Sequence, residues 1–357
     1  MIKRKSFQIS EIEISENRSP FIIAELSGNH NGSIKKARKL IKAAADSGVN
    51  AIKLQTYTAD TMTIPSTAPD FQISNGLWKG KSLYELYEWA HTPWQWHKEL
   101  FDYANELGLI AFSSPFDETA VDFLETLNVP AYKIASFELT DIPLIKKVAS
   151  TGKPIILSTG MASLEDIQLA IKCIQKTSES PFCLLHCVSG YPTPLDDINL
   201  RGIELLKEKF SCPVGLSDHT LTTLTSVCAT SMGASIIEKH ITLNRGDGSP
   251  DSEFSLEPKE FTRLCQDVKS AFSCLGHRDK VLKESEKGNI QFRRSIYVVK
   301  DIKKNQLLTK ENIRIIRPSY GLAPKNYEGV IGCRVNQDIK SGTPLSHSLI
   351  TQNINAL

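Results

Sequence analysis

The sequence lacks any long apolar run. No stretch approaches the ~20 consecutive apolar residues that a membrane-spanning helix requires. The first twenty residues, MIKRKSFQISEIEISENRSP, also lack the apolar core of a secretory signal peptide. We therefore expect a cytoplasmic protein that has no membrane partner.

Charge of one sign is not in excess either. The chain has 42 basic and 40 acidic residues and a formal net charge of +2, whereas proteins that bind nucleic acid through its phosphates need a strongly basic surface. A Walker-type glycine-rich loop is also absent, so a nucleoside triphosphate is not implied. We expect no nucleic-acid partner.

Paired cysteine motifs are missing as well. The chain has eight cysteines and no CxxC pair, and Cys183 and Cys187 fall within one apolar run. This spacing argues against a disulfide framework or a zinc site. It indicates core thiols in a reducing cytoplasm.

The sequence does contain a repeated pattern of short apolar runs, most of which end in a polar or charged cluster. The runs cover residues 21–27, 51–55, 109–115, 131–136, 154–160, 182–189, 213–219 and 235–241. Segments with helical periodicity separate them, most clearly at 33–47, 93–107, 118–127 and 164–177. A strand followed by a helix, eight times over, is typical of an α/β fold of the (β/α)8 TIM-barrel type. The chemistry of such barrels lies at the C-terminal ends of the strands.

The length of 357 residues suits one barrel of ~250 residues and a small additional module. We assign 1–20 to an N-terminal extension, either irregular or a short antiparallel hairpin, and 21–275 to the barrel. Residues 276–289 form a charged linker, and 290–357 a small β-rich domain. The connection at 56–92 is unusually long and rich in aromatic residues, which favours a lid or specificity element over a disordered insertion.

Two histidines end the last two predicted strands. Because strand side chains alternate between faces, Ser217 shares a face with His219, and Glu238 shares one with His240. If these strands are neighbours in a barrel, both imidazoles converge on one divalent transition ion at its mouth. Two unrelated structural histidines are the alternative.

Two lysines lie inside apolar runs, at Lys53 and Lys133, while Ser136, Ser158 and Ser217 lie at the ends of runs. A lysine in a water-poor site needs an anionic partner, so this set suggests a cradle for a phosphate and a carboxylate. The alternative is that both lysines extend along the rim and keep their ammonium groups in water.

Carboxylates complete the candidate site. Glu25 ends the first run, where it would orient a hydroxyl or water, act as a base, or form a structural ion pair with one of the lysines. Asp247 and Asp251 follow the last strand closely. Either of them would bind a polyol substrate or simply end a turn.

These segments resemble the sialic-acid synthase family, which condenses phosphoenolpyruvate with an amino-sugar to form a nine-carbon 2-keto acid. The resemblance is carried by AELSGNHNGS, IKLQTYT, FSSPFD, YKIASFE, LSTGMA, CVSGYPTP, GLSDHT, IEKHITL and PDSEFSLEP, in this order along the chain. Residues 290–350, which include RPSYGL, resemble the family's C-terminal antifreeze-like (SAF) domain. The match extends from about Phe21 to the C-terminus.

The resemblance implies a role for each matching residue. It implies that His219 and His240 bind a divalent ion, in first place Mn²⁺, with Mg²⁺ or Co²⁺ as alternatives, and that Glu25 acts on the reacting water or the sugar. The implied phosphoenolpyruvate-binding residues are Lys53, Ser114, Lys133, Ser136, Ser158, Ser189 and Ser217. The implied sugar-binding residues are Gln55, Tyr191, Asp251 and Arg317. Arg317 would come from the C-terminal domain of the other subunit, which implies a domain-swapped homodimer.

Within the family, GLWKGKSLYELYEWAHTPWQWH and RPSYGLAPKNY resemble the pseudaminic acid synthase branch. The implied acceptor is 2,4-diacetamido-2,4,6-trideoxy-L-altrose. Leu26-Ser27-Gly28 departs from the AEAGVNHNG-like form of neuraminate and legionaminate synthases, which are the alternative, and Ser189 replaces their usual Asn. A metal-dependent aldolase that uses free pyruvate and a non-catalytic sugar-binding protein are more distant alternatives.

Overall fold

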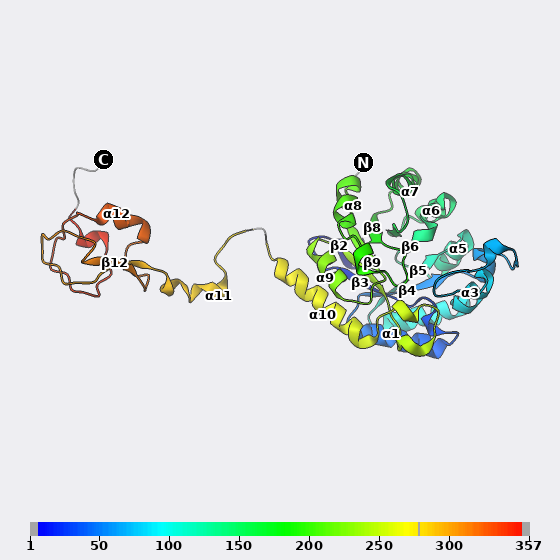
Figure 1. Cartoon of the computed structure of the whole chain (residues 1–357). Helices are drawn as coiled ribbons and strands as arrows, with labels where there is room; N and C mark the ends of the chain where they lie inside the picture. The colour runs from blue at the N-terminus through cyan, green and yellow to red at the C-terminus, as the bar shows by residue number, and fades with distance from the viewer. Residues whose placement is uncertain (1–5, 278, 352–357) are drawn as a thin grey trace. The chain divides into compact units, whose positions relative to one another are not determined.

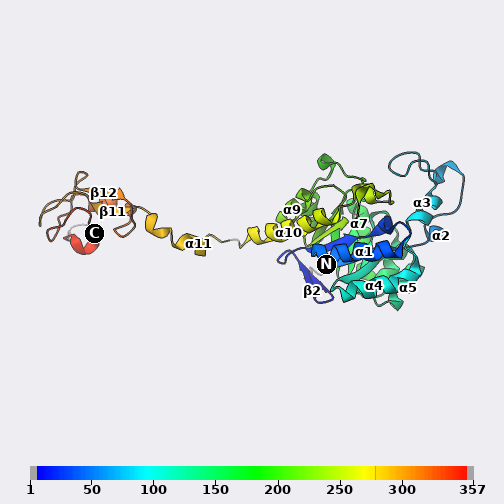
Figure 2. The ribbon, with the colours of Figure 1, turned by 90° about the horizontal axis from the view of Figure 1, so that it is seen from below.

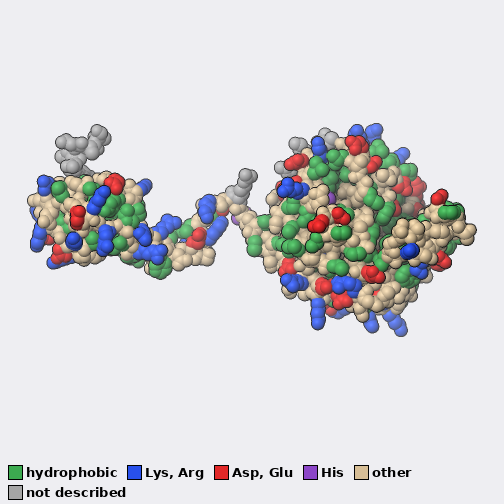
Figure 3. Space-filling model, in the orientation of Figure 1, with side chains coloured by type: hydrophobic (Ala, Val, Ile, Leu, Met, Phe, Trp, Pro, Cys, Tyr) green, Lys and Arg blue, Asp and Glu red, His purple; other side chains and the backbone are tan. Residues whose placement is uncertain are grey.

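The computed structural model describes residues 6–277 and 279–351. The chain divides into two compact units, Met1–Gly276 and His277–Leu357. Among the described residues no helix is both long enough and apolar enough to cross a membrane. All eight cysteines are free thiols, and three of them (Cys183, Cys187 and Cys265) are buried. On the face shown in Figure 3, acidic and basic side chains are interspersed.

The first unit is a closed barrel of eight parallel strands, as predicted. The strands are β3 (Phe21–Glu25), β4 (Ala51–Thr56), β5 (Ile110–Pro115), β6 (Tyr132–Ile134), β7 (Ile155–Ser158), β8 (Phe182–Cys187), β9 (Val214–Asp218) and β10 (Ile236–His240). Each lies within one of the predicted apolar runs or extends it by one residue. The barrel closes between β10 and β3, where Ile236 pairs with Phe21 and His240 pairs with Glu25. This closure brings the first and last strand ends of the barrel side by side.

Helices surround the strands (Figures 1 and 2). They are α1 (Ile34–Ser47), α4 (His97–Glu106), α5 (Glu118–Thr126), α6 (Ile142–Ala149), α7 (Leu164–Thr177), α8 (Gly202–Phe210), α9 (Leu224–Ser231) and α10 (Pro258–Leu275). Ser33 and Ser163 cap α1 and α7 by accepting backbone N–H hydrogen bonds. The predicted helix at 93–107 begins too early, because Trp94–Trp96 form a separate 3-10 turn, η3, before α4.

The N-terminal residues adopt the second of the two predicted alternatives. β1 (Ser6–Ile9) and β2 (Ile12–Ser15) form an antiparallel hairpin. Ile9 and Ile14 are fully buried and belong to the same apolar core as the barrel strands. The hairpin is therefore part of the first unit.

The long connection after β4 is ordered. It contains α2 (Ala59–Met62), η2 (Pro69–Phe71) and α3 (Leu83–Ala90), which lie on one side of the barrel in Figure 2. Its aromatic residues are held by specific bonds, since Trp78 Nε1 donates to Pro250 O at 2.8 Å and Trp89 Nε1 donates to Asn31 Oδ1 at 2.9 Å. Three further 3-10 turns, η1 (Ser27–His30), η6 (Arg245–Asp247) and η7 (Ser252–Phe254), follow β3 and β10 at the same end of the barrel.

The second unit has a small apolar core of its own. β11 (Ser295–Val298) and β12 (Ile313–Ile316) pair antiparallel, and isolated antiparallel bridges such as Ile302–Ile339 join other segments of the unit. The remaining elements are α11 (Glu284–Lys287), η8 (Ile290–Phe292), η9 (Pro324–Asn326), α12 (Tyr327–Val330) and η10 (His347–Leu349). Because its strands are few and short, the unit depends on a compact apolar cluster that includes Ile296, Val298, Ile313 and Leu345.

Candidate active site at the C-terminal ends of the barrel strands

The structure gathers the predicted site residues of the first unit at the C-terminal ends of the strands. The fully or nearly buried members are Glu25, Lys53, Ser114, Lys133, Ser158, Ser217, His219 and His240. Gln55, Ser136, Ser189, Tyr191 and Asp251 are partly exposed. Arg317 is exposed and directly follows β12 in the second unit, so its role at this site stays a prediction.

Four buried charges form the centre of the site. Lys53 Nζ lies 2.7 Å from Glu25 Oε2, and the two side chains are 4% and 0% exposed. Glu238 Oε1 lies 3.8 Å from the Nζ atoms of both Lys53 and Lys133. Both lysines are therefore enclosed, and the alternative that they extend along the rim into water is wrong. The two ammonium groups and two carboxylates balance, as buried charges generally must.

Glu238 is a central residue that the sequence-based site assignment missed. The period-two alternation of β10 already places it on the face of His240, and this was the available indication. Its contacts with two lysines depend on the pairing of β10 with β9 and β3, where Glu238 lies opposite Ser217 and Ile23.

Hydroxyl groups surround the charges. Lys53 Nζ donates to Ser114 Oγ at 3.2 Å, and Lys133 Nζ donates to Ser158 Oγ at 2.6 Å. Ser217 Oγ donates to Glu238 Oε1 at 3.1 Å. Lysines and hydroxyls in one buried cluster match the donor set of a phosphate and carboxylate cradle.

Two further serines meet at Gly160, which follows β7. Ser136 Oγ accepts the Gly160 N–H at 3.1 Å. A Cβ atom added to Gly160 would lie 2.3 Å from Ser189 Oγ and 2.8 Å from Ser136 Oγ. A side chain at residue 160 would therefore displace the hydroxyls of Ser136 and Ser189 from these positions.

Burial shifts the pKa values of several groups in and beside the cluster. Burial raises the pKa of Glu25, although the neighbouring Lys53 ammonium opposes this shift. Burial lowers the pKa of Lys133, against the attraction of Glu238. Burial also raises the pKa of Glu138, a second residue missed from the sequence, to about 7. Glu138 follows β6 within η4 (Ser136–Glu138), so its place after a barrel strand was the available indication. Perturbed groups that cluster at a barrel mouth are characteristic of active sites.

The two histidines are adjacent. Their ring centroids are 5.4 Å apart. His219 Nδ1 lies 2.9 Å from Val188 O, and a carbonyl oxygen can only accept, so Nδ1 carries a proton. Burial, followed by the nearby His219 and Lys53, holds the pKa of His240 well below its usual value, so this ring is neutral.

These rings are the residues that could hold a divalent ion. His240 Nδ1 is buried and has no hydrogen-bond partner among the described residues. No cluster of three or more His, Cys, Asp or Glu side chains in residues 6–277 and 279–351 is arranged to hold a metal. A two-histidine set fits an ion whose remaining positions are filled by substrate or water.

Aromatic side chains enclose the histidines. The Tyr191 ring lies 4.6 Å from that of His219 and 5.1 Å from that of Phe254. Phe254, which the sequence did not single out, lies 4.9 Å from His240, and Trp78 of the long connection lies 6.0 Å from Tyr191. The long connection thus contributes to the wall of the site.

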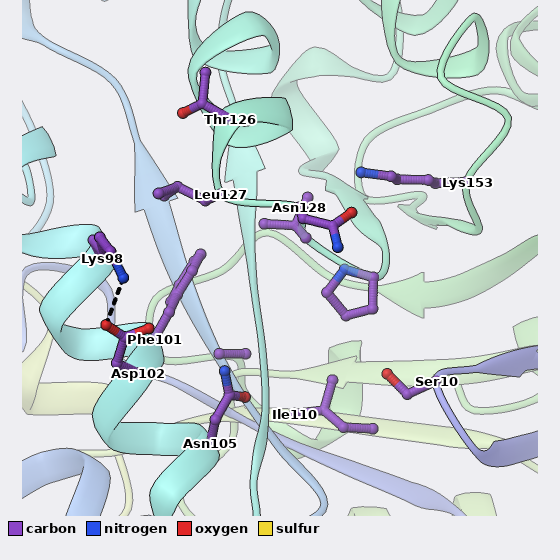
Figure 4. A pocket seen from close by; sticks show the side chains of 13 residues that line it. Ser10, Lys98, Phe101, Asp102, Asn105, Ile110, Thr126, Leu127, Asn128 and Lys153 are labelled. Atoms are coloured by element: carbon purple, nitrogen blue, oxygen red, sulfur yellow. Dashed lines mark hydrogen bonds and ion pairs between the residues drawn. The ribbon is translucent and has the colours of Figure 1, made fainter.

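A separate cavity of about 570 Å³ lies at the N-terminal end of β5, beside Ile110 and Ala111 (Figure 4). None of the predicted site residues lines it. Its two lysines already have partners, since Lys98 pairs with Asp102 at 2.8 Å and Lys153 pairs with Glu125 at 2.6 Å. It is therefore distinct from the charged site at the opposite ends of the strands.

Comparisons with known proteins agree with this geometry. The model of the NeuB family matches residues 40–280, and that of the SAF domain matches residues 293–351. The chain is 44% identical over 332 residues to the pseudaminic acid synthase of Campylobacter jejuni strain 81-176, covering 93% of this chain and 97% of that protein. It is 43% identical over 337 residues to the pseudaminic acid synthase of Helicobacter pylori strain 26695, covering 94% and 99%.

A solved structure shares the architecture. The chain is 34% identical to the N-acetylneuraminic acid (sialic acid) synthetase of Leptospira borgpetersenii, solved in complex with citrate. The match has a TM-score of 0.72 and covers 81% of this chain and 96% of that chain.

Proposed function

Because the chain belongs to the NeuB family, we propose that it condenses phosphoenolpyruvate with 2,4-diacetamido-2,4,6-trideoxy-L-altrose to form pseudaminic acid and phosphate. The observation that carries this proposal is the 43–44% identity to two pseudaminic acid synthases over more than nine tenths of the chain. The buried ammonium groups of Lys53 and Lys133 and the serine hydroxyls beside them support it, because a phosphorylated acid requires such a set of hydrogen-bond donors.

Phosphoenolpyruvate would bind between Lys53 and Lys133. Their ammonium groups and the hydroxyls of Ser114 and Ser158 are held by hydrogen bonds before the substrate arrives. Preorganised donors in a site with little water stabilise anions more strongly than mobile donors do. Clamping the phosphate and the carboxylate also orients C3, the nucleophilic carbon, toward the sugar.

The sugar would bind beside His219 and His240 and against Tyr191. We propose that these two histidines hold a divalent ion, in first place Mn²⁺, with Mg²⁺ or Co²⁺ as alternatives. When bound, such an ion acts as a Lewis acid that makes the aldehyde carbon of the open-chain sugar more electrophilic. His240 contributes a neutral ring, as a ligand must.

The bond changes follow from the two half-sites. The C2–C3 π electrons of phosphoenolpyruvate form the new C–C bond from C3 to C1 of the aldehyde. The C1=O π bond opens, its oxygen takes up a proton to become a hydroxyl, and positive charge develops at C2. Water adds at C2 and loses one proton, for which Glu25 is the nearby buried base with a raised pKa. The tetrahedral intermediate then releases phosphate by C–O cleavage, which leaves the 2-keto acid.

We propose further that the enzyme acts in the cytoplasm as a homodimer with an exchanged C-terminal domain. In this arrangement Arg317 of one subunit reaches the sugar in the partner's site. The exposure of Arg317 makes it available for such a contact.

The decisive experiment measures phosphate release from phosphoenolpyruvate with the altrose- and mannose-configured 2,4-diacetamido sugars and with N-acetylmannosamine, each with and without Mn²⁺. We expect Mn²⁺-dependent turnover of the altrose sugar and, in H₂¹⁸O, label in the keto acid. Turnover of N-acetylmannosamine alone would assign the chain to the neuraminate branch. Label in phosphate would contradict C–O cleavage, and turnover of pyruvate without phosphate release would indicate an aldolase.

A further inference from the structure

The turn η1, which follows β3, contacts two segments that border the proposed sugar site. They are the segment after β10 and the long connection that contains α3. Asn29 Nδ2 donates to Ile241 O at 2.9 Å and to Ser255 Oγ at 2.8 Å. Ser249 Oγ donates to Asn29 O at 3.3 Å. All four residues of η1 are buried. This turn is therefore packed closely against the segment that follows β10.

Gly28 is the point of closest approach. A Cβ atom added there would lie 2.8 Å from Pro250 Cγ and 3.0 Å from Ala90 O, closer than side chains normally approach. Pro250 belongs to the segment after β10, and Ala90 ends α3 of the long connection. Gly28 does not have a positive φ angle. The requirement for glycine thus comes from these contacts and not from backbone strain.

A displacement of Pro250 would also move Trp78, which lies beside Tyr191 in the aromatic wall of the site. Pro250 O accepts the hydrogen bond from Trp78 Nε1 at 2.8 Å. The Trp78 ring lies 6.0 Å from that of Tyr191, which in turn lies 4.6 Å from His219. Pro250 therefore connects Gly28 to the side of the site that faces the sugar.

The same turn holds the carboxylate next to Pro250. Burial raises the pKa of Asp251, while the Ser27 hydroxyl and the Gly28 backbone N–H stabilise its charged form. Ser27 has a left-handed backbone with φ of 42°. Its side chain is buried, and the Asp251 carboxylate is the charged group that its hydroxyl stabilises.

We propose that Ser27 and Gly28 are positioning residues that determine which acceptor sugar the enzyme takes. They do so by fixing the Asp251 carboxylate and the Pro250–Trp78 contact relative to the aldehyde site. Gly28 leaves the space into which Pro250 and Ala90 pack. Ser27 holds the Asp251 carboxylate. The inference deepens the proposed function and rests on it. A shift of 1 Å in a positioning group changes rates by about a hundredfold, so a single methyl group at residue 28 is enough to alter selectivity.

The fold has room to accommodate the change. Pro250 and Trp78 line a surface cavity of about 350 Å³ together with Lys79, Lys81 and Trp89. The segment can therefore give way when a side chain is added at residue 28. We expect a folded enzyme with an altered sugar site and not an unfolded chain.

The test compares Gly28→Ala, Gly28→Val and Ser27→Ala with Gly246→Ala. The control glycine lies in the same segment after β10, has no positive φ angle, and would place its Cβ no closer than 3.4 Å to any neighbouring atom. For each protein, KM and kcat are measured for phosphoenolpyruvate and for each sugar that the wild type converts.

We expect KM for the preferred sugar to rise at least about tenfold in Gly28→Ala and Ser27→Ala, and further in Gly28→Val. The preference between altrose- and mannose-configured sugars should fall, while KM for phosphoenolpyruvate and the control stay within about twofold of wild type. An unchanged sugar KM, or an equal rise in both KM values, would overturn the inference. If Gly28→Ala does not fold, the KM of Ser27→Ala for the sugar tests the inference by itself. A wild-type enzyme that prefers another sugar corrects the proposed function, and the same variants then test the inference on that sugar.

Discussion

The strongest stability prediction concerns the ion pair behind the two histidines. Lys239 and Asp218 immediately precede His240 and His219, and their side chains are both 0% exposed. Lys239 Nζ lies 2.7 Å from Asp218 Oδ2 and 2.6 Å from Thr220 O. Asp218 also accepts hydrogen bonds from Thr220 N at 2.9 Å and from Thr225 Oγ1. The pair therefore links the ends of β9 and β10.

Lys239→Met would leave the Asp218 carboxylate buried without its cation. Removing one partner of a buried pair costs about 3–5 kcal/mol, because the remaining charge is desolvated and uncompensated. For a unit of this size the loss corresponds to a fall of roughly 10 °C in Tm. Replacing both charges with neutral groups, in Asp218→Asn/Lys239→Met, should restore stability to within about 1 kcal/mol of wild type.

Urea unfolding followed by far-UV circular dichroism measures these differences. The matched control is Lys98→Met, because the Lys98–Asp102 pair, drawn in Figure 4, has a similar length of 2.8 Å. Its side chains are 74% and 57% exposed. Its loss should cost less than about 0.5 kcal/mol. Equal losses for Lys239→Met and Lys98→Met, or a double variant as unstable as Lys239→Met, would refute the reasoning.

Three further predictions concern the site. His240→Ala removes one of the two rings available to a divalent ion, so Mn²⁺-dependent turnover should disappear while the circular dichroism spectrum stays unchanged. Turnover by the variant at the wild-type rate would exclude this role for His240. Arg317→Ala should raise KM for the sugar by about 10–100-fold, the loss of a charged hydrogen bond, with the dimer retained in gel filtration; an unaffected KM would argue against a cross-subunit contact. Burial raises the pKa of Glu138 to about 7 from its usual 4.5, so the folded state binds the extra proton between these values. The free energy of unfolding should therefore fall as pH rises from about 4.5 to 7. Urea unfolding at a series of pH values should show a smaller fall in the free energy of unfolding for Glu138→Gln than for wild type. The same pH dependence in both proteins would contradict the raised pKa of Glu138.

Local patterns were sufficient to predict the barrel. Eight apolar runs predicted eight strands, and Ser33 and Ser163 predicted helix starts, because burial periodicity and capping act over only a few residues. The strand ends also indicated Lys53, Lys133, His219 and His240, since parallel strands in a barrel place their ends at one rim. The pattern did not distinguish the helical turn of Trp94–Trp96 from the start of α4.

Contacts between distant segments could not be predicted in this way. The place of Glu238 between two lysines depends on the register of β10 against β3 and β9. The burial of Phe254 against His240 depends on how the segment after β10 folds back over the barrel mouth. Neither follows from spacing along the chain, because each depends on residues that only barrel closure brings together.

The sequence by itself determined the order of strands and helices, the strand ends that carry the chemistry, and the resemblance that pointed to the family. Only the tertiary structure decided how these ends interact. It pairs Glu25 with Lys53, encloses Lys239 with Asp218, and leaves Gly28 no space for a side chain between Pro250 and Ala90. The physical reason is range: periodicity and caps are local, whereas ion pairing, burial and steric contact depend on which segments meet in space.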